Sequence, residues 1–100
     1  ICNPNNPTGY LYSEEEMETL RQIVLKHDIF LISDEVYREF CYEDAVHHSA
    51  MKLKGAENNV ILIDSASKRF SACGIRIGRM ISVLLHLVRV DNTYRKAFFL

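Results

Sequence analysis

Two short runs of apolar residues constrain the fold of this 100-residue chain more than any other feature of its sequence. Residues 29–33 read Ile-Phe-Leu-Ile-Ser and residues 60–63 read Val-Ile-Leu-Ile, and polar residues bound both runs. Continuous apolar runs of this length are typical of parallel strands buried on both faces between helices. Ile1 and Cys2 are predicted to end an earlier strand, so three strand ends follow one another at intervals of roughly 30 residues, as in strand–helix–strand units. The fold class indicated is α/β, with a mostly parallel sheet and flanking helices.

The segment between the first two predicted strands has the signals of an amphipathic helix. Ser13 and Glu16 form the pattern of a capping box, and acidic residues fill the first turn, where the helix dipole favours them. Apolar side chains then recur at helical spacing on one face, at Met17, Leu20, Ile23 and Val24. Residues 3–11 before this helix form a loop, residues 75–82 are predicted to form a further strand, and residues 91–99 a short helix.

Composition and charge exclude several classes of protein. A net charge of −1 argues against a general nucleic-acid binder, and 48% hydrophobic residues argue against a disordered tail. The longest uncharged apolar stretch, residues 80–88, is shorter than the roughly 20 residues that a membrane-spanning helix needs. Three cysteines without metal-ligand spacing indicate free thiols in the cytoplasm. The adjacent His47 and His48 are expected to be a solvated pair.

Positive charge gathers in the second part of the chain. Residues 1–64 hold five Lys or Arg and twelve Asp or Glu, whereas residues 65–100 hold seven and one. This asymmetry indicates either a local anion site or a solvated basic face. Between Lys68 and Arg79 there are four cations and no acid, together with the hydroxyl of Ser71, and Gly74 and Gly78 are expected to permit close backbone approach.

Three polar segments follow the three predicted strands. They are residues 3–9, 34–37 and 64–68. In open α/β sheets, ligands bind beyond the carboxyl ends of the strands. Because the carboxyl ends of parallel strands meet at one edge, we expect the three segments to lie close together.

Each segment carries residues with two possible interpretations. Lys68, near a strand end and partly desolvated, can form a Schiff base with an aldehyde, or it is an ordinary surface lysine. Asp34 can meet the protonated ring nitrogen of a cofactor that Tyr37 also reaches, or it caps a helical turn over residues 35–40. Asn6 stands in a tight turn in which Gly9 permits positive φ, and its amide either faces the same ligand or no ligand at all.

The remaining candidates would bind a phosphate. Ser65, Ser67 and Arg76 supply two hydroxyls and a planar guanidinium, which together make a phosphate cup, although basic loops with serines are also common without one. An acid, a phenol, an amide, a lysine and an arginine–serine cup on one sheet edge suit pyridoxal 5′-phosphate.

Three motifs in order strengthen this interpretation. Asn-Pro-Asn-Asn-Pro-Thr-Gly at residues 3–9, Asp-Glu-Val-Tyr at 34–37 and Ser-Ala-Ser-Lys-Arg-Phe at 65–70, followed by Gly-Ile-Arg-Ile-Gly at 74–78, resemble the fold-type-I pyridoxal-phosphate aminotransferases. The resemblance is to the class I/II branch, which includes aspartate aminotransferase, and it covers residues 1–82. We therefore expect residues 1–82 to be part of the large cofactor-binding domain and residues 83–100 to be an unassigned tail.

The resemblance implies a role for each candidate residue. Lys68 matches the lysine that binds the cofactor as a Schiff base and then moves the proton, and Asp34 matches the acid that keeps the ring nitrogen protonated. Tyr37 and Asn6 match the residues that hydrogen-bond the phenolic oxygen of the cofactor. The phosphate ligands of the family are matched by Ser65, Ser67 and Arg76. The cofactor supplies the electronic chemistry and the lysine the acid–base chemistry.

The implied reaction is amino transfer between an amino acid and a 2-oxo acid, carried out by a homodimeric parent enzyme that needs no nucleic acid, membrane or metal. Family members are several times longer than 100 residues. The chain holds neither the upstream phosphate-binding turn and ring-stacking aromatic residue nor the downstream arginine that binds the substrate carboxylate. The alternative function is therefore a catalytically silent α/β fragment that binds the cofactor or only a phosphate.

Overall fold

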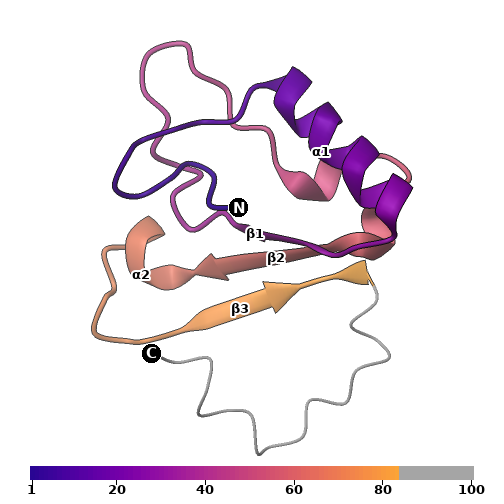
Figure 1. Cartoon of the computed structure of the whole chain (residues 1–100). Helices are drawn as coiled ribbons and strands as arrows, with labels where there is room; N and C mark the ends of the chain where they lie inside the picture. The colour runs from indigo at the N-terminus through magenta and orange to yellow at the C-terminus, as the bar shows by residue number, and fades with distance from the viewer. Residues whose placement is uncertain (84–100) are drawn as a thin grey trace, which may run out of the picture.

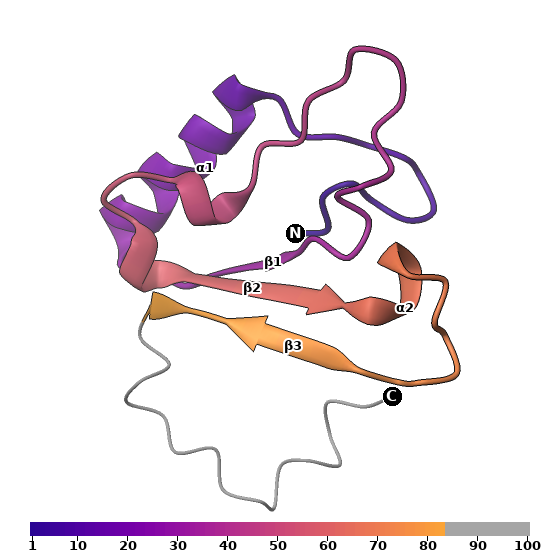
Figure 2. The same ribbon diagram turned by 180° about the vertical axis from the view of Figure 1, so that it is seen from behind.

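A computed structural model describes residues 1–83 of the chain, which form a three-stranded sheet with helical segments beside it (Figure 1). The sheet order is β1–β2–β3, with β1 and β2 parallel and β2 and β3 antiparallel. Figure 2 shows from behind that α1 lies on one side of this sheet and that α2 follows directly from the end of β2. The elements in chain order are α1 (Glu14–His27), β1 (Leu31–Asp34), the 3₁₀ turns η1 (Ala50–Lys52) and η2 (Glu57–Asn59), β2 (Val60–Ser65), α2 (Ala66–Arg69) and β3 (Gly78–Ile81).

Helix α1 begins at the capping box that its sequence predicts. The hydroxyl of Ser13 accepts a hydrogen bond from the Glu16 amide, and the Glu16 carboxylate accepts one from the Ser13 amide, which completes the capping box. The helix ends at His27 and is capped by Asp28, which adopts a left-handed conformation with φ 48° and donates its amide hydrogen to the Val24 carbonyl. A short polar side chain tolerates this conformation better than a branched one does.

The sheet register brings the three polar segments to one edge. Asp34 is aligned with Ile63 on β2, and it forms an isolated parallel bridge with Cys2 on its other side. Cys2, Asp34 and Ile63 thus stand side by side, and the chain leaves each of them in the same direction. The predicted convergence of the three segments is confirmed for the backbone, although the first predicted strand is reduced to this single bridge.

The expectation that the strands are buried on both faces is wrong for the described part of the chain. Leu31 and Ser33 of β1 are buried, but Ile32 between them is 51% exposed. The burial of β2 also alternates along the strand. The reason is geometric: successive side chains of a strand point to opposite faces, and within residues 1–83 the helical segments cover one of them.

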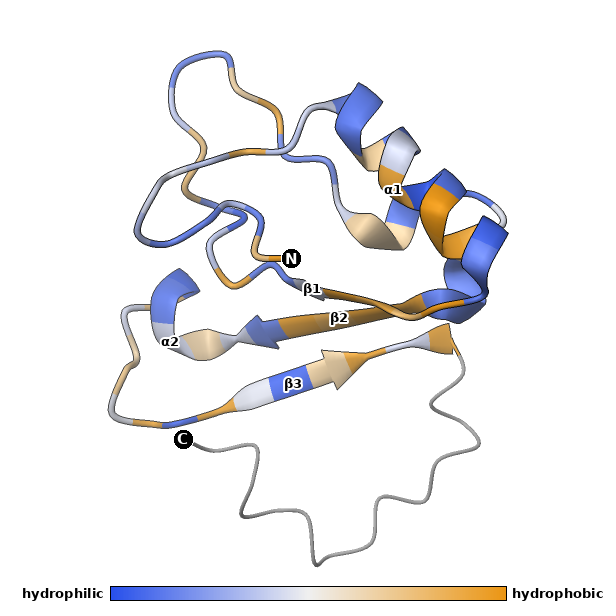
Figure 3. Cartoon of the chain, viewed as in Figure 1, coloured by the Kyte–Doolittle hydropathy of each residue, from blue (hydrophilic) through white to orange (hydrophobic). Residues whose placement is uncertain are grey.

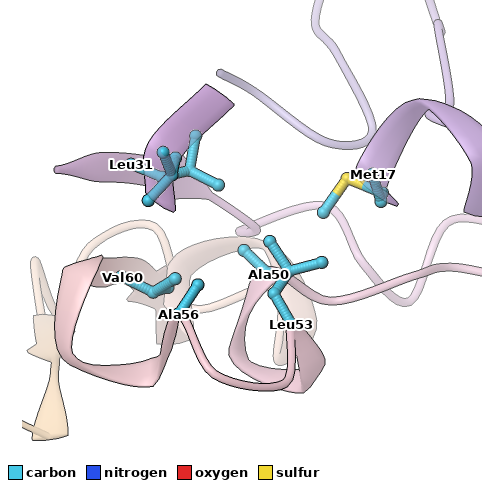
Figure 4. Close-up of a cluster of buried hydrophobic side chains, with 7 residues drawn as sticks. Met17, Leu31, Ala50, Leu53, Ala56 and Val60 are labelled. Carbon is cyan, nitrogen blue, oxygen red and sulfur yellow. The ribbon is translucent and has the colours of Figure 1, made fainter. Parts of the chain in front are cut away.

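The core lies between α1 and the covered face of the sheet (Figure 4). Hydropathy agrees with this position of the core, since the strands β1 and β2 are largely apolar, whereas α1 carries both polar and apolar residues (Figure 3). Full burial of a large apolar side chain contributes about 1.5–3 kcal/mol, so burial of this cluster stabilises the described fold. The buried cluster consists of Met17, Val24, Leu31, Ala50, Leu53, Ala56 and Val60.

Two further expectations concern the end of the chain. The strand predicted over residues 75–82 is shorter in the structure, where β3 spans Gly78–Ile81 and runs antiparallel to β2. This makes the described sheet mixed, although it belongs to the expected α/β class. The helix predicted over residues 91–99 lies outside the described residues, as does the predicted tail from residue 84 onward.

Candidate functional site

Asn6, Tyr37 and Lys68 meet at the edge of the sheet where the three segments emerge. The Asn6 side-chain amide donates a hydrogen bond of 2.9 Å to the Tyr37 hydroxyl. The Lys68 ammonium nitrogen lies 5.7 Å from the centroid of the Tyr37 ring, within the range of a cation–π contact. These contacts join one residue from each of the three motifs. Lys68 is exposed rather than partly desolvated, because it lies on α2, beyond the end of β2, and not within the buried strand.

The tight turn that carries Asn6 is fixed by its own hydrogen bonds. Gly9 has φ 72°, the positive value expected for it, and its amide donates to the Asn5 carbonyl. The amide of Asn5 donates in turn to the Tyr10 carbonyl, and the Asn5 side chain accepts from the Thr8 hydroxyl at 2.7 Å. Asn6 therefore lies in a turn whose two ends are joined by hydrogen bonds.

Asp34 combines the two interpretations that its sequence position left open. One of its carboxylate oxygens accepts a hydrogen bond of 3.1 Å from the Val36 amide, so Asp34 does cap the turn that begins at residue 35. Within residues 1–83 the other oxygen has no hydrogen-bond partner and no cation within ion-pair distance. A half-buried carboxylate with one unpaired oxygen has the chemistry to meet a protonated ring nitrogen.

The candidate phosphate ligands are brought together only in part. The Ser65 hydroxyl caps α2 by accepting from the Ser67 amide at 3.1 Å, and it donates to the Ile77 carbonyl at 3.1 Å. Arg76, next to Ile77, is exposed, has φ 56° and makes no hydrogen bond or ion pair with any other described residue. A non-glycine residue in this region of φ is uncommon, and such strained positions occur often at ligand sites.

The close backbone approach expected at Gly74 and Gly78 concerns a bound phosphate and stays a prediction, whereas their protein surroundings are described by the structure. A Cβ atom at Gly78 would lie 3.5 Å from the Asp64 carbonyl oxygen, an ordinary contact, and one at Gly74 would meet nothing within 4 Å. Neither position therefore requires glycine for a close approach of protein segments.

A buried polar cluster beneath the site escaped the sequence analysis. Glu35 is fully buried, and one of its oxygens accepts from the Ala50 amide at 2.8 Å and from the Ser33 hydroxyl at 3.2 Å. Its other oxygen lies 3.6 Å from the Nε2 atom of His47, whose side chain is 11% exposed. The expectation of a solvated histidine pair is thus wrong for His47, because the loop folds it onto Glu35. Strand alternation was the available signal, since Glu35 and Ser33 necessarily share the face opposite Asp34.

The protonation of His47 follows from this burial. Desolvation lowers the pKa of His47 below its usual value, and this effect exceeds the opposing attraction of Glu35. Asn3 completes the cluster, since it is fully buried, donates to the His48 carbonyl and accepts from the Tyr12 amide. Asn3 thereby ties the first motif to the loop before η1.

A second unpredicted cluster surrounds Asp64. Its carboxylate accepts hydrogen bonds from Arg38 at 2.9 Å and from Arg79 at 2.8 Å, and its side chain is 7% exposed. A cavity of about 300 Å³ lies beside it, lined by residues that include Ser65, Arg69 and Arg79. A larger cavity of about 660 Å³ lies between α1 and residues 48–54, away from the candidate site.

Comparison with known proteins decides the family. The family model for aminotransferase class I and II matches residues 1–97. The chain belongs to this aminotransferase family. It is similar to the aspartate aminotransferase of Musicola paradisiaca (strain Ech703), with 38% identity over 95 residues that cover 92% of the chain and 24% of that protein. It is also 43% identical over 78 residues to a probable aspartate/prephenate aminotransferase of Thermus aquaticus, which covers 78% of the chain and 20% of that protein.

Solved aminotransferase structures share the fold. An aromatic aminotransferase from Pyrococcus horikoshii OT3 superposes with a TM-score of 0.78 and 37% identity, over 81% of this chain and 22% of that one. The N-succinyldiaminopimelate aminotransferase of Mycobacterium tuberculosis gives 0.79 and 32%, over 82% and 21%. The chain thus spans about a fifth to a quarter of the length of the aminotransferases that it matches.

The described residues contain neither a helix suited to span a membrane nor a cluster suited to hold a metal ion. None of the helices within residues 1–83 has the length and apolar character that crossing a membrane requires. In the same part of the chain, no group of three or more histidine, cysteine or acidic side chains is arranged to hold a metal ion.

Proposed function

We propose that this aminotransferase chain forms one wall of a pyridoxal 5′-phosphate site, and that the intact protein transfers amino groups between an amino acid and a 2-oxo acid. The observation that carries the proposal is the meeting of Asn6, Tyr37 and Lys68, one residue from each family motif, at a single sheet edge. The unpaired oxygen of Asp34 supports it, because this oxygen can receive a proton-bearing ring nitrogen.

Each residue has a separate task in this proposal. Lys68 provides the amine that binds the cofactor aldehyde and later carries a proton to and from the substrate carbon. Asp34 holds a proton on the ring nitrogen, and Tyr37 and Asn6 donate hydrogen bonds to the phenolic oxygen. When bound, the cofactor withdraws electrons from the substrate carbon.

The proposed binding of the cofactor phosphate is supported by the charge and the backbone position of the candidate ligands. Ser65 and Ser67 stand at the start of α2, and Arg76 is an exposed cation without a partner among residues 1–83. The hydroxyl of Ser65 would turn from the Ile77 carbonyl to donate to a phosphate oxygen, while Arg76 would bind that phosphate with two parallel hydrogen bonds.

The names of the relatives support a proposal for the substrate classes. Several are named for aspartate, and others for prephenate or kynurenine, so we propose an amino acid and a 2-oxo acid as the substrate classes. We further propose a homodimeric protein in the cytoplasm. The free thiols of Cys2, Cys41 and Cys73 are compatible with that compartment.

Covalent labelling of the lysine tests the proposal. The intact protein is incubated with pyridoxal 5′-phosphate, reduced with borohydride and mapped by peptide mass spectrometry. We expect the label on Lys68 and no transfer activity in Lys68→Ala, whereas Lys52→Ala, on the far side of the fold, should be labelled and active. A label on another lysine would refute the site, and a label on Lys68 without amino transfer would favour the catalytically silent alternative.

A further inference from the structure

We infer that Asp64 is a positioning residue whose buried carboxylate holds the turn bearing Tyr37 against the strand end bearing Ser65. The inference rests on the proposed cofactor site and adds to it a residue that touches neither cofactor nor substrate. Arg38 and Arg79 are the two cations through which Asp64 acts.

The contacts of Asp64 join three segments of the chain. Its Oδ2 atom accepts hydrogen bonds from Arg38 Nη2 at 2.9 Å, on the turn after β1, and from Arg79 Nε at 2.8 Å, on β3. Its Oδ1 atom accepts from the Ser65 amide at 2.8 Å. A single carboxylate therefore fixes the turn and β3 to the end of β2, directly beside a candidate phosphate ligand.

Arg38 transmits this restraint to the ring of Tyr37. The two residues are adjacent in a turn closed by the hydrogen bonds from the Arg38 amide to the Glu35 carbonyl and from the Phe40 amide to the Tyr37 carbonyl. If Arg38 moves, the Tyr37 hydroxyl changes its distance from Asn6, and the ring changes its distance from Lys68. Small displacements of this kind matter because reactive groups must be held close to the productive geometry.

A second ionic link runs in parallel but is more exposed. Glu39 pairs with Arg69, which is adjacent to Lys68, and lies 3.7 Å from Arg38. The Glu39 side chain is 54% exposed, against 7% for Asp64. Exposed ion pairs contribute little because water screens them, so the buried carboxylate carries most of the restraint.

The charge state of Asp64 agrees with this role. Burial alone would raise its pKa, but the hydrogen bonds from Arg38, Arg79 and the Ser65 amide outweigh that effect and hold the pKa below its ordinary value. Asp64 is therefore ionised at neutral pH, and Arg38 and Arg79 leave the cluster with a net positive charge.

Positioning and simple charge make opposite predictions for Asp64→Asn. Removing an anion near a phosphate site should strengthen binding of the cofactor phosphate if charge alone mattered. Loss of the restraint should weaken binding, because Tyr37 and Ser65 would no longer be held together. The sign of the change therefore separates the two effects.

The experiment compares cofactor affinity and the pH dependence of cofactor absorbance in the intact protein. We expect Asp64→Asn and Arg38→Met each to weaken pyridoxal 5′-phosphate binding by about threefold to thirtyfold, and the double variant to lose no more than the larger single loss. The matched control is Glu18→Gln, which removes the exposed charge pair with Arg21 on α1 and should leave affinity unchanged.

The absorbance titration adds a measurement whose result does not change when the protein only loses stability. When Tyr37 and Asn6 donate weaker hydrogen bonds to the phenolic oxygen, the pH midpoint of the absorbance change of the lysine-bound cofactor should rise. If Asp64→Asn acted only by removing a nearby negative charge, the same pH midpoint would fall. Unchanged or tighter binding, a lowered midpoint in Asp64→Asn, or additive losses in the double variant would overturn the inference.

A second variant and a parallel labelling measurement make the test decisive. Arg38→Met probes the same contact from the turn, so unchanged binding in that variant overturns the inference even where Asp64→Asn does not accumulate as folded protein. Covalent labelling of wild-type Lys68 is measured alongside. If wild type is labelled and both variants bind normally, the positioning role fails alone; if wild type is not labelled, the proposed function fails.

Discussion

Replacement of Glu35 tests whether the buried polar cluster supports the site. Glu35→Ala removes the acceptor for the Ser33 hydroxyl and for the Ala50 amide, both of which are buried. An unsatisfied buried donor costs about 1–3 kcal/mol, so two of them would cost about 2–6 kcal/mol. Removal of the second carboxylate oxygen, which has no hydrogen-bond partner, offsets part of this loss. We expect a net decrease in the free energy of unfolding of about 2–4 kcal/mol.

The isosteric variant separates the lost hydrogen bonds from the lost charge. Glu35→Gln keeps one oxygen as acceptor for both donors, and its amide can donate to His47, so it should cost less than about 1 kcal/mol. Unfolding of the intact protein in urea, followed by circular dichroism, gives the three free energies, with Glu15→Ala on the exposed first turn of α1 as the control. A loss below about 1 kcal/mol for Glu35→Ala, or equal losses for both Glu35 variants, would refute the reasoning.

Two further predictions concern Asp34 and His47. Asp34→Asn should leave Lys68 open to labelling but slow amino transfer by about a hundredfold or more, because the neutral amide no longer stabilises a proton on the ring nitrogen; a normal rate in stopped-flow measurements would exclude that role. Because the pKa of His47 is lowered in the fold, the unfolded chain takes up a proton more readily, so the stability associated with neutral His47 is present above the ordinary imidazole pKa and is lost as the pH falls through the lowered value. His47→Gln should flatten this acid-side decrease in melting temperature, and an unchanged pH profile would contradict the assignment.

Local features of the fold were predictable from the sequence to a greater extent than long-range contacts. The capping box of Ser13 and Glu16 and the positive φ of Gly9 were both predictable, because each depends on residues within a few positions of one another. The three motifs gave the family and the candidate site residues, and the sheet register then placed the three segments at one edge. The functional roles assigned to these residues remain predictions that the labelling and affinity experiments test.

The pairing of Asp64 with Arg38 and Arg79, and the folding of His47 onto Glu35, were decided only in three dimensions. Arg38 and Asp64 are 26 residues apart, and charge patterns along a chain do not reveal which distant ions will share a buried site. Burial on one face instead of two was likewise settled by the packing of α1, since an apolar run looks the same in either case. Local backbone conformation depends on neighbouring residues, whereas the partner of a buried charge depends on which segments the whole fold brings into contact.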